Sequence, residues 1–129
     1  MKHKRILLVD DDDDDQLNFK DAIQDVSPET ECLIANNGLE ALDFLQQDGK
    51  DLSLIFLDLN MPKMNGFECL EQLRNDETLN QIPVVIFSTS DNPIDKKLSL
   101  ESGAKRFITK TPDFGSLKSK IREMLQADF

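Results

Sequence analysis

The chain has 129 residues, enough for one domain with a buried core, and its 25 acidic against 15 basic side chains give a net charge of -10. This charge repels nucleic acids, and no basic stripe with interleaved aromatic residues offsets it, so we expect no direct binding to nucleic acid. The apolar stretch behind the basic start is short and runs into aspartates, which predicts no secretion signal and no membrane span.

The cysteines and the histidine suggest no chemistry of their own. Cys32 and Cys69 match no zinc or redox spacing, and free thiols are typical of a reducing compartment, so we expect a cytoplasmic protein with buried, apolar cysteines. His3 lies in a terminal segment that we expect to be solvated, and we assign it no role.

Short apolar runs alternate along the chain with longer segments of helical periodicity. Strands rich in β-branched or large apolar residues are predicted over residues 6–9, 31–35, 52–57, 84–88 and 106–108. Helices are predicted over residues 14–26, 38–47, 66–74, 93–102 and 114–125. Pro28 ends the first helix, Gly103 suits the end of the fourth, and Pro62 with Gly66 separates the third strand from its helix. The alternation predicts an α/β fold, a five-stranded parallel sheet with helices on both faces, as a single domain over residues 1–129 without an output domain.

An unbroken run of aspartates, Asp10 to Asp15, follows the first strand. Asp13 to Asp15 suit the start of a helix, where unpaired amides and about half a positive charge favour carboxylates. A calcium loop of the EF-hand type is an alternative, because every second aspartate of the run is spaced like its ligands. Against it, the sixth position holds an aspartate instead of glycine, and the preceding segment is strand-like.

The first and third predicted strands both end in carboxylates. Asp10 and Asp11 follow the first strand, and Asp58 follows the run of apolar and small residues over 52–57. Because parallel neighbouring strands present their carboxyl ends together, these carboxylates would meet in one crevice. Their repulsion raises at least one pKa unless a divalent cation or a transferred group relieves it. We therefore expect an acidic metal site.

The fourth and fifth strands add a hydroxyl group and a cation. Ser88, Thr89 and Ser90 stand at the end of the fourth strand, and Lys110 stands near the end of the fifth. A hydroxyl or a lysine after a strand usually only turns the chain or faces water, so neither alone indicates a function. Acid pair, aspartate, hydroxyl and lysine, in that order at the carboxyl ends of one sheet, are what metal-assisted phosphoryl transfer requires.

Over its whole length the chain resembles the response-regulator receiver domains of two-component signalling. ILLVDD matches the family's first strand and acid pair, LDLNMP with Gly66 its phosphoacceptor strand and loop, PVVIFST its hydroxyl strand, and GAKRFITK its switch aromatic and lysine. The resemblance implies the flavodoxin-like (βα)5 fold of that family.

The resemblance also implies how phosphorylation occurs. Asp58 would accept a phosphoryl group from the phosphohistidine of a sensor histidine kinase or a histidine phosphotransfer protein, and later lose it by autodephosphorylation. Asp11, Asp58 and the carbonyl of Asn60 would hold Mg²⁺, and Asp10 would support the ion through water. Lys110 would pair with the phosphoaspartate, which makes the protein a signalling phosphoacceptor and not a conventional enzyme.

The same resemblance implies a switch. Ser88 would swing to bond a phosphoryl oxygen, Phe107 would then turn inward, and the surface of the fourth and fifth helices would change for a downstream protein that the residues do not identify. Met124 and Phe129, near the last helix, are candidates for a homodimer contact.

Three features depart from the family pattern. Thr111 separates Lys110 from Pro112, whereas lysine is commonly followed directly by proline in the family. Thr89 is larger than the usual residue beside the phosphoryl group, and we expect it to slow access or alter the phosphoryl lifetime. Asn60 flanks the route of hydrolytic water and is a further candidate for tuning that lifetime.

Three other functions would share parts of this pattern. A haloacid-dehalogenase-type phosphatase would need its general acid where Asn60 stands. A flavodoxin-like cofactor carrier would need a phosphate loop after the first strand, where this chain has carboxylates. A receiver-like module that is never phosphorylated and binds a protein constitutively is the remaining alternative, and the retention of every site residue argues against it.

Overall fold

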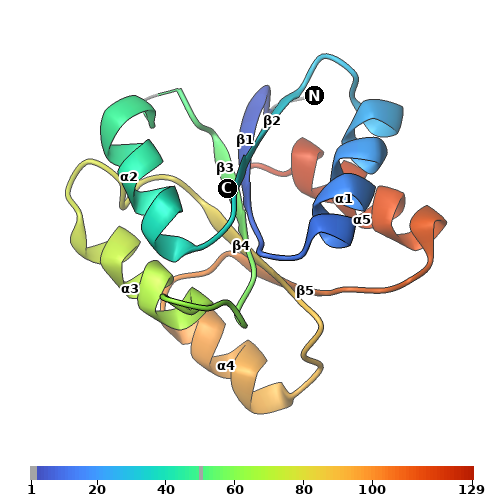
Figure 1. The fold of residues 1–129 in the computed structure, drawn as a ribbon. Coiled ribbons are helices and arrows are strands. Elements are labelled where there is room, and N and C mark those ends of the chain that lie inside the picture. The colour runs from blue at the N-terminus through green and yellow to red at the C-terminus, as the bar shows by residue number, and fades with distance from the viewer. Residues whose placement is uncertain (1–2, 50) are drawn as a thin grey trace.

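The computed structural model describes residues 3–49 and 51–129, which contain a five-stranded parallel sheet in the order β2-β1-β3-β4-β5 (Figure 1). The strands are β1 Arg5–Val9, β2 Glu31–Ala35, β3 Leu54–Leu57, β4 Val84–Ser88 and β5 Arg106–Thr109. The helices are α1 Asp13–Val26, α2 Gly38–Asp48, α3 Gly66–Asn75, α4 Pro93–Glu101 and α5 Phe114–Gln126. The predicted α/β fold is confirmed, and every predicted element is present.

Helices cover both faces of the sheet. α1 and α5 lie side by side on one face, α2 and α3 lie on the other, and α4 packs beside β5 (Figure 1). Among the described residues, no helix is both long and apolar enough to cross a membrane.

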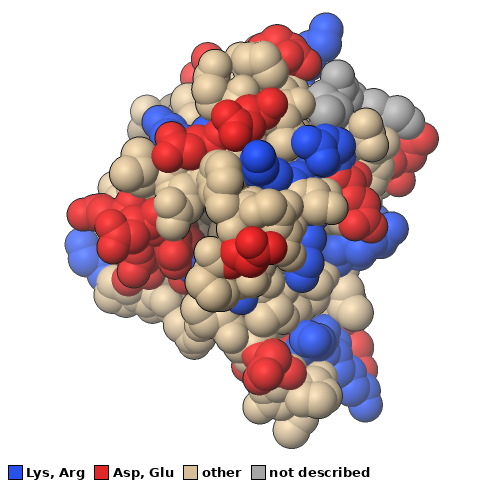
Figure 2. Space-filling model, turned by 90° about the vertical axis from the view of Figure 1, so that its right-hand side faces the viewer, with Lys and Arg blue, Asp and Glu red and all other residues tan. Residues whose placement is uncertain are grey.

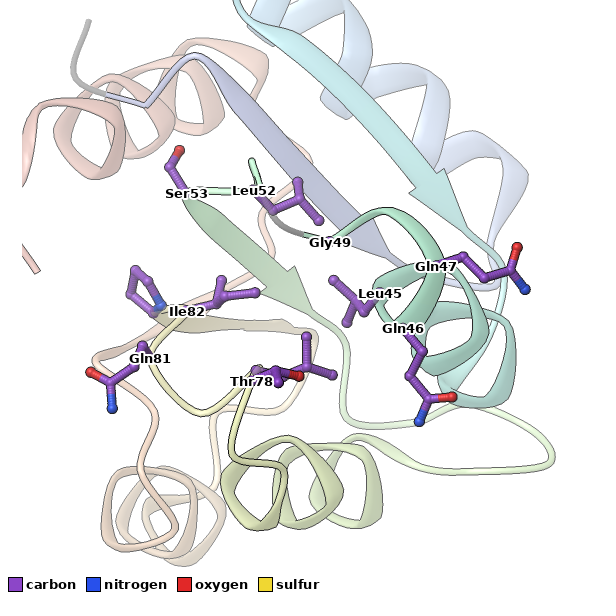
Figure 3. A pocket seen from close by; sticks show the side chains of 11 residues that line it. Leu45, Gln46, Gln47, Gly49, Leu52, Ser53, Thr78, Gln81 and Ile82 are labelled. Atoms are coloured by element: carbon purple, nitrogen blue, oxygen red, sulfur yellow. The ribbon is translucent and has the colours of Figure 1, made fainter.

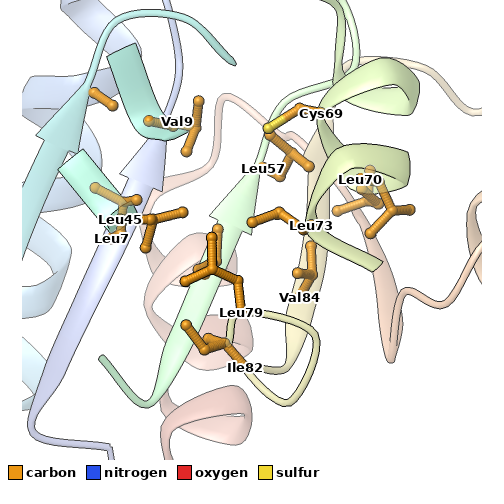
Figure 4. Packing of buried hydrophobic residues seen from close by; sticks show 14 of the residues in the cluster. Leu7, Val9, Leu45, Leu57, Cys69, Leu70, Leu73, Leu79, Ile82 and Val84 are labelled. Atoms are coloured by element: carbon orange, nitrogen blue, oxygen red, sulfur yellow. The ribbon is translucent and has the colours of Figure 1, made fainter. Parts of the chain in front are cut away.

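Each face of the sheet has its own apolar core, because side chains alternate between the two faces along a strand. Figure 4 shows the core under α2 and α3, in which strand residues pack against helix residues; the strand residues include Leu7, Val9, Leu57 and Val84, and the helix residues include Leu45, Cys69, Leu70 and Leu73. β3 is buried along its whole length, as expected for a central parallel strand, and each fully buried Leu or Ile contributes about 1.5–3 kcal/mol.

The expectation that His3 is solvated is wrong. The residue is only 8% exposed, its Nε2 lies 2.9 Å from the carbonyl oxygen of Ala127, and its ring centroid lies 5.9 Å from that of Phe129. Ala127 and Phe129, which follow α5, thus pack against the residue two places before β1. Met124 is buried and Phe129 packs against the same core, so both act as core residues here, and the dimer contact stays a prediction.

Replacing His3 with alanine should lower the free energy of unfolding by about 1–2 kcal/mol, because ring packing and a largely buried polar contact are lost together. Urea denaturation at pH 7.5 measures the change. Lys4→Ala is the control, since Lys4 is exposed and adjacent. Equal stability of the two variants would mean that the contact between the chain ends contributes nothing.

Candidate functional site

Asp10 and Asp58 lie side by side at the carboxyl edge of the sheet. Val9 and Leu57, the last residues of β1 and β3, are register partners, and each aspartate directly follows one of them. The backbone N–H of Asp10 donates to the carbonyl of Ala35 and that of Asp58 to the carbonyl of Val9, both over 3.0 Å. This crevice lies where the strand order reverses around β1, the usual place for ligands in open parallel sheets.

The acidic residues form the cluster that the sequence predicts. Asp10, Asp11 and Asp58 each offer a carboxylate oxygen, and these oxygens lie within 4.8 Å of one another. Asp10 is fully buried, Asp58 is 6% exposed, and Asp11 is exposed at the mouth of the crevice.

Burial and repulsion together raise the pKa values of the two inner carboxyl groups. Burial is the main cause that raises the pKa of Asp58 to about 6; the charge of Asp10 adds to it, and Lys110 opposes it. Burial also raises the pKa of Asp10, against the attraction of the nearby Lys110 ammonium. The expected shift is present, but desolvation contributes more to it than the repulsion from which it was predicted.

The cluster fits a divalent cation. Hard cations such as Mg²⁺ bind carboxylate oxygens and retain several waters. Oδ2 of Asp10 is buried and has no hydrogen-bond partner of normal geometry among the described residues, although it forms an ion pair with Lys110. Such an oxygen can accept a hydrogen bond from a metal-bound water, while Asp11 and Asp58 offer oxygens for direct contact.

Lys110 brings a positive charge into this cluster. Its Nζ lies 2.8 Å from Oδ2 of Asp10, 2.8 Å from Oδ2 of Asp15 and 3.5 Å from Oδ2 of Asp58. The side chain is only 10% exposed. Burial acts to lower the pKa of Lys110, but the three carboxylates outweigh it and hold the pKa above its usual value. The ammonium group therefore stays charged at neutral pH.

The interposed Thr111 does not displace Lys110 from the sheet edge. The backbone N–H of Lys110 donates to the carbonyl of Ser88 over 2.7 Å, which continues the pairing of β4 with β5. Asp113 then caps α5 by accepting a hydrogen bond from the backbone N–H of Ser116.

The remaining predicted residues lie around the crevice or below it. Ser88 is fully buried and its Oγ accepts a hydrogen bond from the backbone N–H of Ser90 over 3.2 Å, while Thr89 is exposed. Asn60 is exposed in the loop after β3, and its backbone N–H acts to lower the pKa of the Asp58 carboxyl group, against the effect of burial. Phe107 lies on β5, half-buried against the core, with Nζ of Lys96 5.8 Å from its ring centroid.

Comparison with known proteins gives the family. The family model described as response regulator receiver domain matches residues 6–122. The chain belongs to this family. Response regulator Rcp1 of Synechocystis sp. is 35% identical over 124 residues, which are 92% of this chain and 84% of that protein. The likeness on which the sequence analysis relied is thereby confirmed.

Solved structures agree with the family assignment. A crystal structure of the phosphorylated cyanobacterial phytochrome response regulator RcpA has a TM-score of 0.84 at 34% identity, covering 95% of this chain and 91% of that one. A crystal structure of the Mn(2+)-bound form of response regulator Rcp1 has a TM-score of 0.84 at 32% identity, covering 98% of this chain and 97% of that one.

A cavity would not have located the site in this receiver domain. A hollow of about 480 Å³ lies at the opposite end of the sheet, between the end of α2 and the segments that lead into β3 and β4 (Figure 3). Leu45, Leu52 and Ile82 are among the residues that line it, and none of the lining residues that the structure describes is charged. The site is marked instead by charged groups that converge at the carboxyl edge.

Sequence reasoning missed one partner of Lys110 in the receiver domain. Asp15 was predicted only to stabilise the start of α1, and it does lie in the first turn, where its backbone N–H donates to the side chain of the N-cap residue, Asp12. No local signal connects it with a lysine 95 residues away. The excess acidity of the aspartate run is the one hint that the sequence offers.

Proposed function

We propose that Asp58 of this receiver domain accepts a phosphoryl group from the phosphohistidine of a sensor histidine kinase or a histidine phosphotransfer protein, in a reaction that requires Mg²⁺. The observation that carries the proposal is the carboxylate of Asp58 at the sheet edge, beside two further carboxylates and 3.5 Å from the ammonium of Lys110. A structural relative described as phosphorylated adds support.

The transfer needs no general base. Near pH 7.5, above its pKa of about 6, Asp58 is mostly ionised and is already a nucleophile. One of its oxygens would form a bond to phosphorus while the bond from phosphorus to the imidazole nitrogen breaks and leaves its electron pair on that nitrogen. The product carries about -1.5 to -2 charge units on its phosphoryl group, and Lys110 is placed to offset part of this charge.

Mg²⁺ would be held by Asp11, Asp58 and the carbonyl of Asn60, with Asp10 acting through a water molecule. When bound, the ion supplies neutralisation of the charge on the phosphoryl oxygens. Among the described residues, the charged side chains that meet at the crevice are acidic apart from Lys110, and they offer the oxygen ligands that the ion prefers.

Phosphorylation would then change the surface beside α4. The hydroxyl of Ser88 would turn from the loop after β4 toward a phosphoryl oxygen, and the half-buried ring of Phe107 would move further inward. Lys96, over that ring, would follow, and a downstream protein would recognise the altered surface. Thr89, exposed beside Ser88, and Asn60 would affect how fast the phosphoryl group is gained and lost.

We place this function in one receiver domain acting in the cytoplasm through protein contacts. Cys69 is buried as predicted, whereas Cys32 is only half-buried. Burial still raises the pKa of both thiols to about 12, so both stay protonated and unreactive. On the face formed by α1 and α5, basic side chains lie in separate groups rather than along a stripe, and acidic side chains gather densely at the left edge (Figure 2). That distribution favours a protein partner over nucleic acid.

The test is incubation with acetyl phosphate, with and without Mg²⁺, followed by intact mass measured quickly from neutral solution because acyl phosphates hydrolyse. One added phosphoryl group is expected on the wild type with Mg²⁺, and none on Asp58→Asn or after chelation of the metal. Asp43→Asn, an exposed change on α2, is the matched control and should react like the wild type. If the wild type forms no adduct while a known receiver reacts in parallel, the constitutive interaction module becomes the better function.

A further inference from the structure

Lys110 is closer to Asp15 than to the proposed phosphoacceptor. Its Nζ lies 2.8 Å from Oδ2 of Asp15, to which it donates a hydrogen bond, and 3.5 Å from Oδ2 of Asp58. The third carboxylate, that of Asp10, is fully buried and also lies 2.8 Å from Nζ. The ammonium group is therefore shared, and Asp58 has the longest of its ion pairs.

Asp15 stands apart from the metal cluster. The carboxylates that lie close enough to hold one cation belong to Asp10, Asp11 and Asp58. Asp15 belongs to α1, and the hydrogen bond from its backbone N–H to the side chain of Asp12 fixes its place in the first turn. Its side chain is 35% exposed, so it reaches Lys110 from the solvent side of the crevice while Asp10 contacts it from inside.

We propose that Asp15 is a positioning residue that restrains Lys110 before phosphorylation. The inference rests on the proposed function, because the restraint matters only if Lys110 must approach a phosphoryl group on Asp58. A phosphoryl group that arrives at Asp58 has to attract Lys110 away from Asp15, since three hydrogens on one ammonium cannot serve all of these oxygens and the phosphoryl oxygens at full strength. Asp15 thus opposes formation of the phosphorylated state.

The restraint by Asp15 slows the gain of the phosphoryl group but not its hydrolysis. Before transfer, Lys110 pairs with Asp15; afterwards, it pairs with the phosphoryl oxygens, and Asp15 has already lost it. An interaction present in the starting state and absent from the transition state slows the forward step. Hydrolysis starts from the phosphorylated state, in which the contact is already broken, so Asp15 leaves its rate almost unchanged.

The experiment compares Asp15→Asn with Asp14→Asn in the full chain. Both changes remove one negative charge from the first turn of α1, but Asp14 is exposed and its side chain is not among the ion-pair partners of Lys110. Each protein is phosphorylated with acetyl phosphate and Mg²⁺, and the initial rate is measured by intact mass. The donor is then removed, and the decay of the adduct is followed.

Asp15→Asn should gain the phosphoryl group about fivefold faster than Asp14→Asn, the effect expected from loss of one partly exposed ion pair. Decay should agree within about twofold between the two variants. Asp15→Glu, which keeps the charge, should return the initial rate toward that of the wild type. Removal of a first-turn carboxylate slightly destabilises a helix, so the melting temperature of Asp15→Asn should be equal to or lower than that of the wild type. A higher initial rate together with such a melting temperature distinguishes the restraint on Lys110 from a purely structural role.

Equal initial rates for Asp15→Asn and Asp14→Asn, or a slower Asp15→Asn, would overturn the restraint while leaving the phosphoacceptor function intact. An initial rate for Asp15→Glu as high as that for Asp15→Asn would also overturn the restraint, because the negative charge would then not be its cause. If the wild type gains no phosphoryl group, the proposed function itself fails, so the two failures give different results.

Discussion

Replacement of Asp58 by asparagine should stabilise the protein by about 3 kcal/mol at pH 7.5 in the absence of divalent cations. The cause is the environment of the carboxyl group. Burial, with a contribution from Asp10, raises the pKa of Asp58 from 3.8 to about 6, in spite of the nearby Lys110. The charged form is therefore less favourable in the folded protein than in the unfolded chain.

The sign of the effect follows from the direction of this shift. At a pH well below 3.8, Asp58 is protonated in both states and the variant and wild type should be nearly equal. As pH rises through about 6, the folded protein must give up the proton that it holds more tightly than the unfolded chain, so the wild type loses stability. The advantage of Asp58→Asn should be about 1.5 kcal/mol at pH 5 and about 3 kcal/mol at pH 7.5.

Urea denaturation at these two pH values, with a chelator present, measures the difference. Asp43→Asn is the control, because Asp43 is exposed on α2 and its replacement should change stability by less than about 0.5 kcal/mol at either pH. Addition of Mg²⁺ should reduce the advantage of Asp58→Asn, since an ion that binds only the folded wild type stabilises it. An advantage of the same size at pH 5 and pH 7.5 would contradict the assigned cause.

The loss of stability caused by the ionised carboxylate of Asp58 is linked to the proposed function. In the proposed function, the carboxylate of Asp58 must lie close to the proposed metal ligands and to Lys110, and that placement forces partial desolvation and like-charge proximity. Sites of this kind are commonly less stable than their neutral variants, because selection acts on the reaction and not on the resting fold. The stability gain on neutralisation and the loss of phosphoryl uptake should therefore occur in the same variant.

The fold and the central site residues were predictable because they depend on local patterns. Apolar runs alternating with helical periodicity define a parallel sheet, and such a sheet places the residues after each strand at one edge. Asp10, Asp58 and Lys110 therefore had to converge once the strands were assigned. The start of β3 shows the limit: the run of apolar and small residues predicted a strand from Leu52, but β3 begins at Leu54, and the backbone N–H of Leu52 donates instead to the turn residue Gly49.

The contacts that sequence reasoning missed depend on side-chain geometry between distant segments. Asp15 meets Lys110 across 95 residues, and His3 meets Ala127 across 124 residues. Neither pair has a spacing or a composition that predicts it. The size of the burial contribution at Asp58 was also missed, because a sequence places charges together but does not show how completely the surrounding residues exclude water.

Replacement of Gly66 by alanine should lower the free energy of unfolding by about 3 kcal/mol. Gly66 is the first residue of α3, and its N–H donates to the carbonyl of Leu59 over 2.8 Å. A β-carbon at this position would lie 2.7 Å from Cα of Leu59 and would also clash with the carbonyl oxygen of Asp58. Both obstacles are backbone atoms, so no side-chain rotation can relieve them.

The matched control is Gly115→Ala, in the first turn of α5. The nearest atoms to a β-carbon there are 3.8 Å away, on the side chain of Asp113, so alanine fits and should stabilise the protein by about 0.5–1 kcal/mol by restricting the unfolded chain. Urea denaturation should give changes of opposite sign. Equal changes in the free energy of unfolding for Gly66→Ala and Gly115→Ala would contradict the predicted clash, because the loop after β3 would then move away from α3 at no cost. Because the segment that must move carries Asp58, the proposed phosphoacceptor, Gly66→Ala should also slow phosphoryl uptake from acetyl phosphate, whereas Gly115→Ala should not.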